Sequence, residues 1–275
     1  MAESSGGGSL LKKGCLLGCG CVTVIGLAAV GGGAAYIVPM FGKFDNAVEK
    51  RKALVEKYGE QDEFTPALDG AVPADRLDTY LEVRRGLRPF CDRFDDTMGR
   101  IERISEREHD DDPSLREVLG VTRAAFGLAP LLGDYFDARN KALLDAGMGL
   151  GEYTYIHIVA AYAGRPPESG GLPELRDLNR RVRRAVIAML RAQRDALAAA
   201  EAEDAEPSPA RTALEAELVL LDKDRRRRPY QDGLPPPIVA SLAGHEDAIE
   251  ELRCPIATQF ELARNRRRGI SIQAD

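Results

Sequence analysis

The uncharged run between Gly14 and Gly42 constrains this chain more than any other feature of its sequence. A transmembrane helix needs about 20 mostly apolar residues to cross a hydrocarbon core of roughly 30 Å. The run is long enough, and leucine, isoleucine and valine recur along it. We therefore predict a flexible N-terminal tail over residues 1–13, a transmembrane helix over residues 14–40 and a soluble helical domain over residues 41–275.

The residues around this run favour an anchor that stays attached over a signal peptide that is removed. Lys12 and Lys13 form a positive segment before it, and residues 33–35 loosely resemble a small-residue cleavage site. The run is longer than the about 7–15 apolar residues of a usual signal peptide. Cys19 ends a stretch that resembles a lipobox, but too few apolar residues precede it. We therefore expect a signal anchor.

Positive residues flank the run on both sides, so the sidedness of the body depends on which group dominates. Lys12 and Lys13 adjoin the start of the run, whereas more lysines follow it within residues 43–57. The second group alone would favour a cytoplasmic body. A long domain can be translocated despite its charge, however. We expect an extracytoplasmic (periplasmic) body, with a cytoplasmic-facing body as the alternative.

Small residues within the run are spaced for helix packing. Gly14 and Gly18 form a GxxxG pattern, and Ala28 and Gly32 repeat the same spacing. Such spacing lets two helix backbones approach closely in a bilayer. The pattern predicts a homo-oligomer through the transmembrane helix, and the alternative is a glycine-rich helix without a partner.

The rest of the chain predicts helices only. Apolar residues recur every three or four positions and do not alternate for long, which is the helical pattern. The predicted helices cover about residues 43–58, 74–88, 90–104, 112–146, 153–164, 173–203 and 210–224, with two shorter helices within 236–253. Pro89 separates the second helix from the third, and Pro130 should kink the fourth. Residues 153–164 are apolar around most of their circumference and should form a buried central helix. The predicted fold class is all-α, with a single-pass N-terminal transmembrane helix followed by an amphipathic multi-helix bundle.

Two cysteines, Cys91 and Cys254, fall in the predicted soluble domain. In an oxidising compartment they could form a disulfide that closes a very long loop. Two buried free thiols are the alternative.

One group of polar aromatic residues lies inside the predicted central helix. It consists of Tyr153, Tyr155, His157 and Tyr162. These side chains could line a ligand pocket, with phenol and imidazole groups orienting the ligand. Their rings could equally fill the core while their polar tips bond to the backbone or to an arginine. The core interpretation is favoured.

Other motifs argue against a metal site and against catalysis. Glu106 and His109 have the Glu-x-x-His spacing of di-iron bundles, but the second such pair is missing. We find no nucleotide-binding loop, zinc-protease motif or nucleophile elbow, and three histidines provide few general bases. We therefore expect no metal and no cofactor, and an enzyme is disfavoured. The net charge of −6 argues against a nucleic-acid partner.

The run Arg225, Arg226, Arg227 and Arg228 could contact anionic lipid headgroups, at about 1 kcal/mol per arginine near a charged leaflet. It could also contact a protein partner or RNA, and a solvated face is the default interpretation.

Taken together, these features predict a membrane-anchored helical bundle that acts as a non-catalytic interaction or envelope-associated protein. The alternative function is binding of an apolar or lipid-like ligand within the bundle, and an enzyme without a recognisable motif is the third interpretation.

Overall fold

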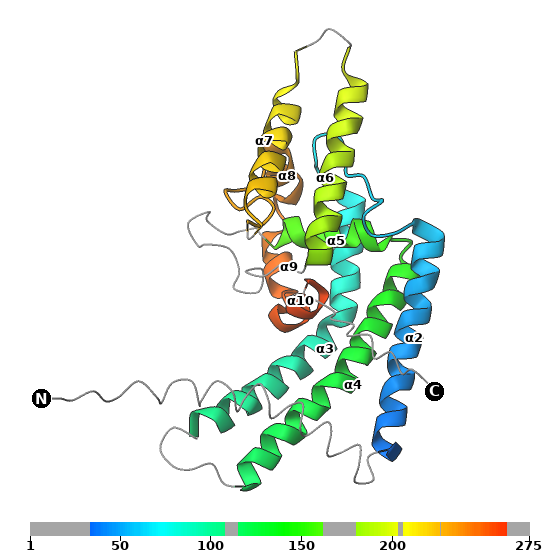
Figure 1. Ribbon diagram of the computed structural model, residues 1–275, viewed down its shortest axis with the longest axis vertical. Helices are drawn as coiled ribbons and strands as arrows, with labels where there is room; N and C mark the ends of the chain where they lie inside the picture. The colour runs from blue at the N-terminus through cyan, green and yellow to red at the C-terminus, as the bar shows by residue number, and fades with distance from the viewer. Residues whose placement is uncertain (1–33, 108–114, 162–179, 203–205, 226, 263–275) are drawn as a thin grey trace, which may run out of the picture.

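The computed structural model describes residues 34–107, 115–161, 180–202, 206–225 and 227–262 (Figure 1). Within these residues the protein is all-helical, which confirms the predicted multi-helix fold, and the described segments contain no strand. The helices are α2 (Ala34–Tyr58), α3 (Ala74–Arg107), α4 (Leu115–Asp145), α5 (Leu150–Ala160), α6 (Arg180–Ala200), α7 (Pro209–Lys223), α8 (Pro236–Leu242), α9 (Glu246–Glu251) and α10 (Pro255–Leu262).

Three long helices, α2, α3 and α4, form the lower layer of the molecule (Figure 1). Helix α4 packs against both α2 and α3, and α5 crosses the upper part of this layer in contact with both α2 and α3. Helices α6 and α7 form an antiparallel hairpin at the opposite end from the start of α2. The short helices α8, α9 and α10 follow, and α10 packs on α3.

Pro89 and Pro130 lie inside helices that continue through them. The predicted break at Pro89 is wrong, because α3 runs from Ala74 to Arg107 without interruption. Proline fixes φ near the helical value, and it removes only one backbone hydrogen bond. Pro89 is exposed, so water can satisfy the carbonyl oxygen that loses its partner. Helix α4 likewise continues through Pro130.

Helix α5 is buried around nearly its whole circumference, as its composition predicts. It begins at Leu150, three residues before the predicted start. Gly151 lets the loop between α2 and α3 lie directly on the first turn of α5. A Cβ atom at this position would lie 2.5 Å from Cβ of Phe64 and 2.7 Å from the carbonyl oxygen of Gln61. The core of the molecule therefore surrounds α5.

The end of the chain differs from the prediction. Two short helices were expected within residues 236–253, and the structure has α8 and α9 there, followed by α10. The sequence pattern did not reveal α10, because a helix of two turns carries too few residues to show a helical period. Its first residue is Pro255, a favoured residue at the first helical position.

No helix within the described residues combines the length and the apolar character that a membrane span needs. Most of the predicted transmembrane helix, including Gly14, Gly18, Ala28 and Gly32, lies outside the described residues. The 1–13 tail lies outside them as well.

Candidate functional site: a buried polar cluster

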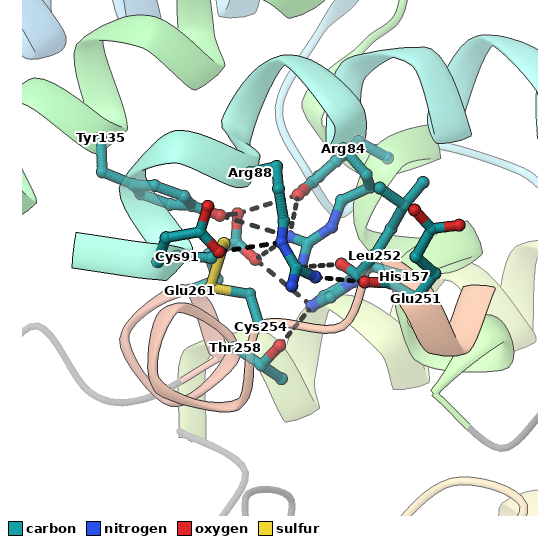
Figure 2. The surroundings of a disulfide bond; sticks show 12 residues. Arg84, Arg88, Cys91, Tyr135, His157, Glu251, Leu252, Cys254, Thr258 and Glu261 are labelled. Carbon is teal, nitrogen blue, oxygen red and sulfur yellow. Dashed lines mark hydrogen bonds and ion pairs between the residues drawn. A yellow bond between two sulfur atoms is a disulfide. The ribbon is translucent and has the colours of Figure 1, made fainter. Parts of the chain in front are cut away.

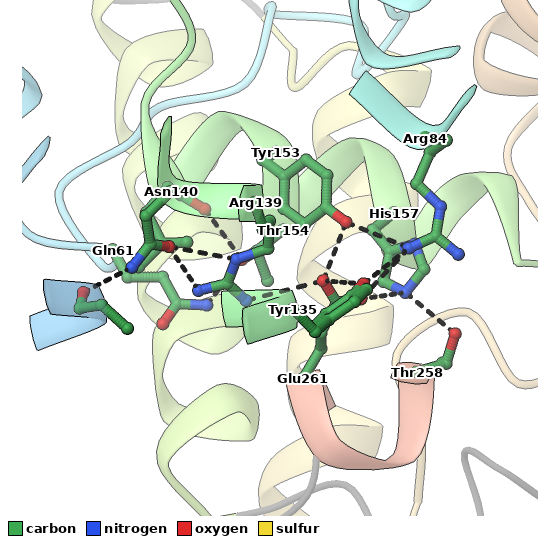
Figure 3. Close-up of polar contacts among 12 residues, drawn as sticks. Gln61, Arg84, Tyr135, Arg139, Asn140, Tyr153, Thr154, His157, Thr258 and Glu261 are labelled. Atoms are coloured by element: carbon green, nitrogen blue, oxygen red, sulfur yellow. Dashed lines mark hydrogen bonds and ion pairs between the residues drawn. The ribbon is translucent and has the colours of Figure 1, made fainter. Parts of the chain in front are cut away.

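Four helices contribute polar side chains to one buried group, here called the polar cluster (Figure 3). Its members are Tyr80 and Arg84 of α3, Tyr135 and Arg139 of α4, Tyr153 and His157 of α5, and Thr258 and Glu261 of α10. On α3, α4 and α5 the two members are four residues apart, and on α10 they are three apart. Both spacings place two side chains on the same face of a helix.

The carboxylate of Glu261 lies at the centre of the polar cluster. Its side chain is 2 % exposed. The hydroxyl groups of Tyr135 and Tyr153 donate to its Oε1 at 2.8 and 2.9 Å. Nη1 of Arg84 lies 3.3 Å from Oε2, and Nη1 of Arg139 lies 3.5 Å from Oε1. One carboxylate thus connects α10 to α3, α4 and α5.

Glu261 is ionised at neutral pH. Burial by itself raises the pKa of this carboxyl group. The positive charges of His157 when protonated, Arg84 and Arg139, with the hydrogen bond from Tyr135, outweigh burial and hold the pKa below its ordinary value. The two guanidinium groups carry this effect at neutral pH, because His157 is then uncharged.

His157 is a neutral, fully bonded imidazole. Burial lowers its pKa to about 4. The negative charge of Glu261 raises this pKa, whereas the positive charges of Arg84 and Arg139 lower it. Nδ1 lies 2.8 Å from the hydroxyl of Tyr80, and Nε2 lies 3.3 Å from Oε2 of Glu261. Since an ionised carboxylate can only accept, the proton of the neutral ring belongs on Nε2, and Nδ1 accepts from Tyr80.

The tyrosines act as hydrogen-bond donors and fill space with their rings. Burial raises the pKa of Tyr80 to about 12 and also raises the pKa of Tyr135 and Tyr153 well above the ordinary value, so all three phenols are protonated at neutral pH. The ring of Tyr153 stacks on that of His157, with centroids 5.7 Å apart and planes 11° from parallel. The rings of Tyr80 and Tyr153 also pack, at 5.6 Å.

Arg84 joins the polar cluster to the segment before α10. Its Nη1 donates to the hydroxyl of Tyr153 at 3.1 Å, and its Nη2 donates to the carbonyl of Leu252 at 3.3 Å. Burial lowers the pKa of this guanidinium, but Tyr153, Tyr135, Tyr80 and Glu261 together raise it above its ordinary value. Nε of Arg84 is buried and has no hydrogen-bond partner among the described residues.

A disulfide between Cys91 and Cys254 lies beside the polar cluster (Figure 2). The two Cα atoms are 5.5 Å apart, and both residues are buried. Cys254 directly precedes α10, so the bond attaches the start of this helix to α3. One turn earlier on α3, Arg88 donates to the carbonyl of Glu251. Of the two alternatives that the sequence leaves open for these cysteines, the structure has the disulfide.

A small cavity adjoins the polar cluster. Its polar lining comes from Tyr80, Arg84, His157, Arg253 and Thr258, and leucine, isoleucine, alanine and proline side chains complete the wall. The cavity volume is about 20 Å³. One water molecule needs about 10–15 Å³, whereas pockets for drug-sized ligands have about 300–1,000 Å³. The cavity therefore has room for a single particle of the size of a water molecule.

The connectivity from Tyr80 through His157 to Glu261 resembles that of a proton relay, in which a carboxylate orients an imidazole. Such a relay acts on a substrate only if the substrate reaches the terminal group. Tyr80 is 4 % exposed and His157 is 5 % exposed. In the described structure this arrangement therefore holds helices together, because its polar atoms contact one another.

The predicted pocket residues lie in different places. Tyr153 and His157 belong to the polar cluster. Tyr155 points elsewhere and donates to the carbonyl of Gly70 at 2.6 Å, while Tyr162 lies outside the described residues. Among the described residues, no group of three or more metal-ligating side chains forms a candidate metal site.

The arginine run does not present its described side chains as one exposed patch. Arg225 is exposed, and Arg226 lies outside the described residues. Arg227 pairs with Glu217 at 2.9 Å and with Asp232 at 2.7 Å. Arg228 is 8 % exposed.

Most members of the polar cluster were not predicted from the sequence. A signal was present, however, because a tyrosine is followed four residues later by arginine or histidine on α3, α4 and α5. Glu261 had no such signal. Its side chain meets Arg84 over a sequence separation of 177 residues.

No family model, curated protein or solved structure matches this chain.

Proposed function

We propose that this chain is a membrane-tethered helical protein of the cell envelope, which contacts a protein partner or a second copy of itself and does not catalyse a reaction. In this proposal residues 14–40 form the tether, and the body lies on the extracytoplasmic side. The observation that carries the proposal is the disulfide between Cys91 and Cys254 inside the helical body. Disulfides persist in oxidising compartments and are rare in the cytosol.

The polar cluster supports a structural role for the body. Its acidic, basic and phenolic groups bond to one another across four helices, and they are buried. Bonds of this kind fix the angles at which helices meet, because each charged group is stabilised only in one arrangement. A body held in this way suits a protein that presents a fixed surface.

The shape of the body fits a tether at one end. Helix α2 begins at Ala34, within the last part of the predicted membrane span of residues 14–40, at the lower end of Figure 1. The hairpin of α6 and α7 lies at the upper end along the longest axis of the molecule. A membrane at the lower end would leave this hairpin pointing away from the bilayer, accessible to a partner.

The cavity beside His157 does not favour the alternative function of binding a lipid-like ligand. With a volume of about 20 Å³ it is more than tenfold smaller than typical ligand pockets of about 300–1,000 Å³.

The proposal is tested by the location and thiol state of the body in cells. The full-length chain carries Cys15→Ser, Cys19→Ser and Cys21→Ser, so that only Cys91 and Cys254 can react with a maleimide polymer. We expect external protease to digest the body in spheroplasts. We also expect the maleimide polymer to shift the denatured protein on a gel only after reduction.

The control for the labelling is the same chain with Cys91→Ser and Cys254→Ser, which should not shift at all. A body that resists protease in spheroplasts, with both thiols labelled before reduction, would contradict the proposal. Recovery of the intact full-length chain from the soluble fraction would contradict the tether.

A further inference from the structure

The polar cluster contains more positive than negative charge. Arg84 is 2 % exposed and Arg139 is 7 % exposed, and both pair with the single carboxylate of Glu261. No other carboxylate among the described residues forms an ion pair with either guanidinium. His157 adds no charge at neutral pH. A buried charge without a counter-charge is strongly disfavoured. Glu261 supplies one negative charge for two guanidinium groups, so one further anion is needed to balance them.

Arg84 also has one N–H donor for which the described residues provide no acceptor. Its Nη1 and Nη2 groups have oxygen acceptors, but its Nε–H has no hydrogen-bond partner among the described residues. A buried N–H group of a charged side chain that lacks an acceptor is rare in folded proteins. The missing acceptor therefore belongs to one of the two guanidinium groups that share the single carboxylate.

The small cavity described above lies against this side chain. Arg84, Arg253 and Thr258 contribute to its wall, and the guanidinium of Arg253 is itself paired with Glu250. The remaining wall is mainly apolar, and such low-dielectric surroundings strengthen electrostatic attraction. The volume of about 20 Å³ admits a single atom-sized anion and is too small for sulfate, phosphate or an organic acid.

We propose that this cavity binds one small monovalent anion of the size of chloride, held by Nε of Arg84 with the hydroxyl of Thr258 and the charge of Arg253 nearby. The anion balances the second guanidinium charge of the polar cluster. Because Arg84 also bonds to Glu261 and to the carbonyl of Leu252, anion binding strengthens the attachment of α10 and of the segment before it to α3. This site is independent of the proposed membrane tether and of any protein partner.

The first test compares salts at equal ionic strength. Thermal unfolding of the purified full-length chain is measured in sodium chloride, bromide, gluconate and sulfate. Chloride and bromide should raise Tm relative to gluconate along a saturable curve, by about 2–4 °C when the ion exceeds its Kd tenfold. Equal Tm in chloride and gluconate, or a rise in chloride that does not saturate, would overturn the proposal.

Variants assign the effect to the cavity. Ala161 belongs to the cavity wall but not to the polar cluster, so Ala161→Leu fills the space and should abolish the difference between chloride and gluconate. The matched control is Arg191→Gln, which removes one exposed positive charge on α6 outside the cavity wall and should keep the difference. An Ala161→Leu protein that keeps the full difference, or an Arg191→Gln protein that loses it, would contradict the assignment.

A direct measurement keeps the proposal falsifiable if Ala161→Leu does not fold. Crystals of the wild-type protein grown or soaked in bromide should show an anomalous peak within hydrogen-bonding distance of Nε of Arg84. A data set with other bromide peaks but none in this cavity would overturn the proposal.

Discussion

Replacing Glu261 with glutamine removes the one carboxylate that pairs with both buried guanidinium groups of the polar cluster. The attractions at 3.3 Å to Arg84 and at 3.5 Å to Arg139 amount to about 5 kcal/mol each at an effective dielectric constant near 20. Desolvation of the carboxylate offsets several kcal/mol of this sum. Glutamine keeps an oxygen that can accept from Tyr135 and Tyr153. We therefore expect Glu261→Gln to lower the free energy of unfolding by about 3–5 kcal/mol.

The assay is urea unfolding of the full-length chain at pH 7, followed by circular dichroism. The matched control is Glu215→Gln, which breaks a partly exposed pair with Arg211 and should cost less than about 1 kcal/mol. The double variant Glu261→Gln with Arg139→Met should recover part of the loss, because it leaves one buried cation fewer. If Glu261→Gln and Glu215→Gln lowered the free energy of unfolding by amounts within about 1 kcal/mol of each other, the central role given to Glu261 would be wrong.

Three further predictions concern His157, the disulfide and a glycine. The pKa of His157 is about 4 in the folded protein and near 6.5 in an unfolded chain, so between these pH values the unfolded chain binds more protons. Stability should fall by about 3 kcal/mol as the pH drops from 6.5 to 4, and His157→Gln should flatten this part of a pH series of unfolding measurements. Replacing both Cys91 and Cys254 with serine should cost up to about 5 kcal/mol, since the bond closes a loop across a separation of 163 residues, and calorimetry compares the two proteins. Gly151→Ala should lower the free energy of unfolding by about 1–3 kcal/mol, because its Cβ would overlap the loop that lies on α5. Gly86→Ala is the control, since a Cβ there would have nothing within 4 Å. It should leave the stability measured by urea unfolding unchanged or raise it by up to about 1 kcal/mol.

The helices of the body were largely predictable from their local pattern. Apolar residues at helical spacing predicted the second half of α2 and most of α4, α6 and α7, and composition predicted that α5 would be buried. The errors arose where a local feature of the sequence is compatible with two different structures. Proline at position 89 is compatible with a helix end or with a continuous exposed helix, and packing against α4 and α10 favours the continuous helix here.

Prediction of the candidate site succeeded for only part of it. Tyr153 and His157 were identified as core residues whose polar tips would need partners, and Arg84 lies among those partners. The sequence could not show that α3 and α4 present the same tyrosine-to-arginine spacing to this helix. It also gave no indication of α10, which brings Glu261 and Thr258 to His157.

The sequence by itself determined which faces of the helices are polar or apolar and which residues share a face, because these properties depend on spacings of three and four residues. It also contains the uncharged run that predicts a membrane tether. Only the tertiary structure decided that Arg84 and Arg139 meet one carboxylate, that Cys91 meets Cys254, and that a small cavity adjoins them. Those contacts join segments far apart in the chain, and their geometry depends on the packing of the whole bundle.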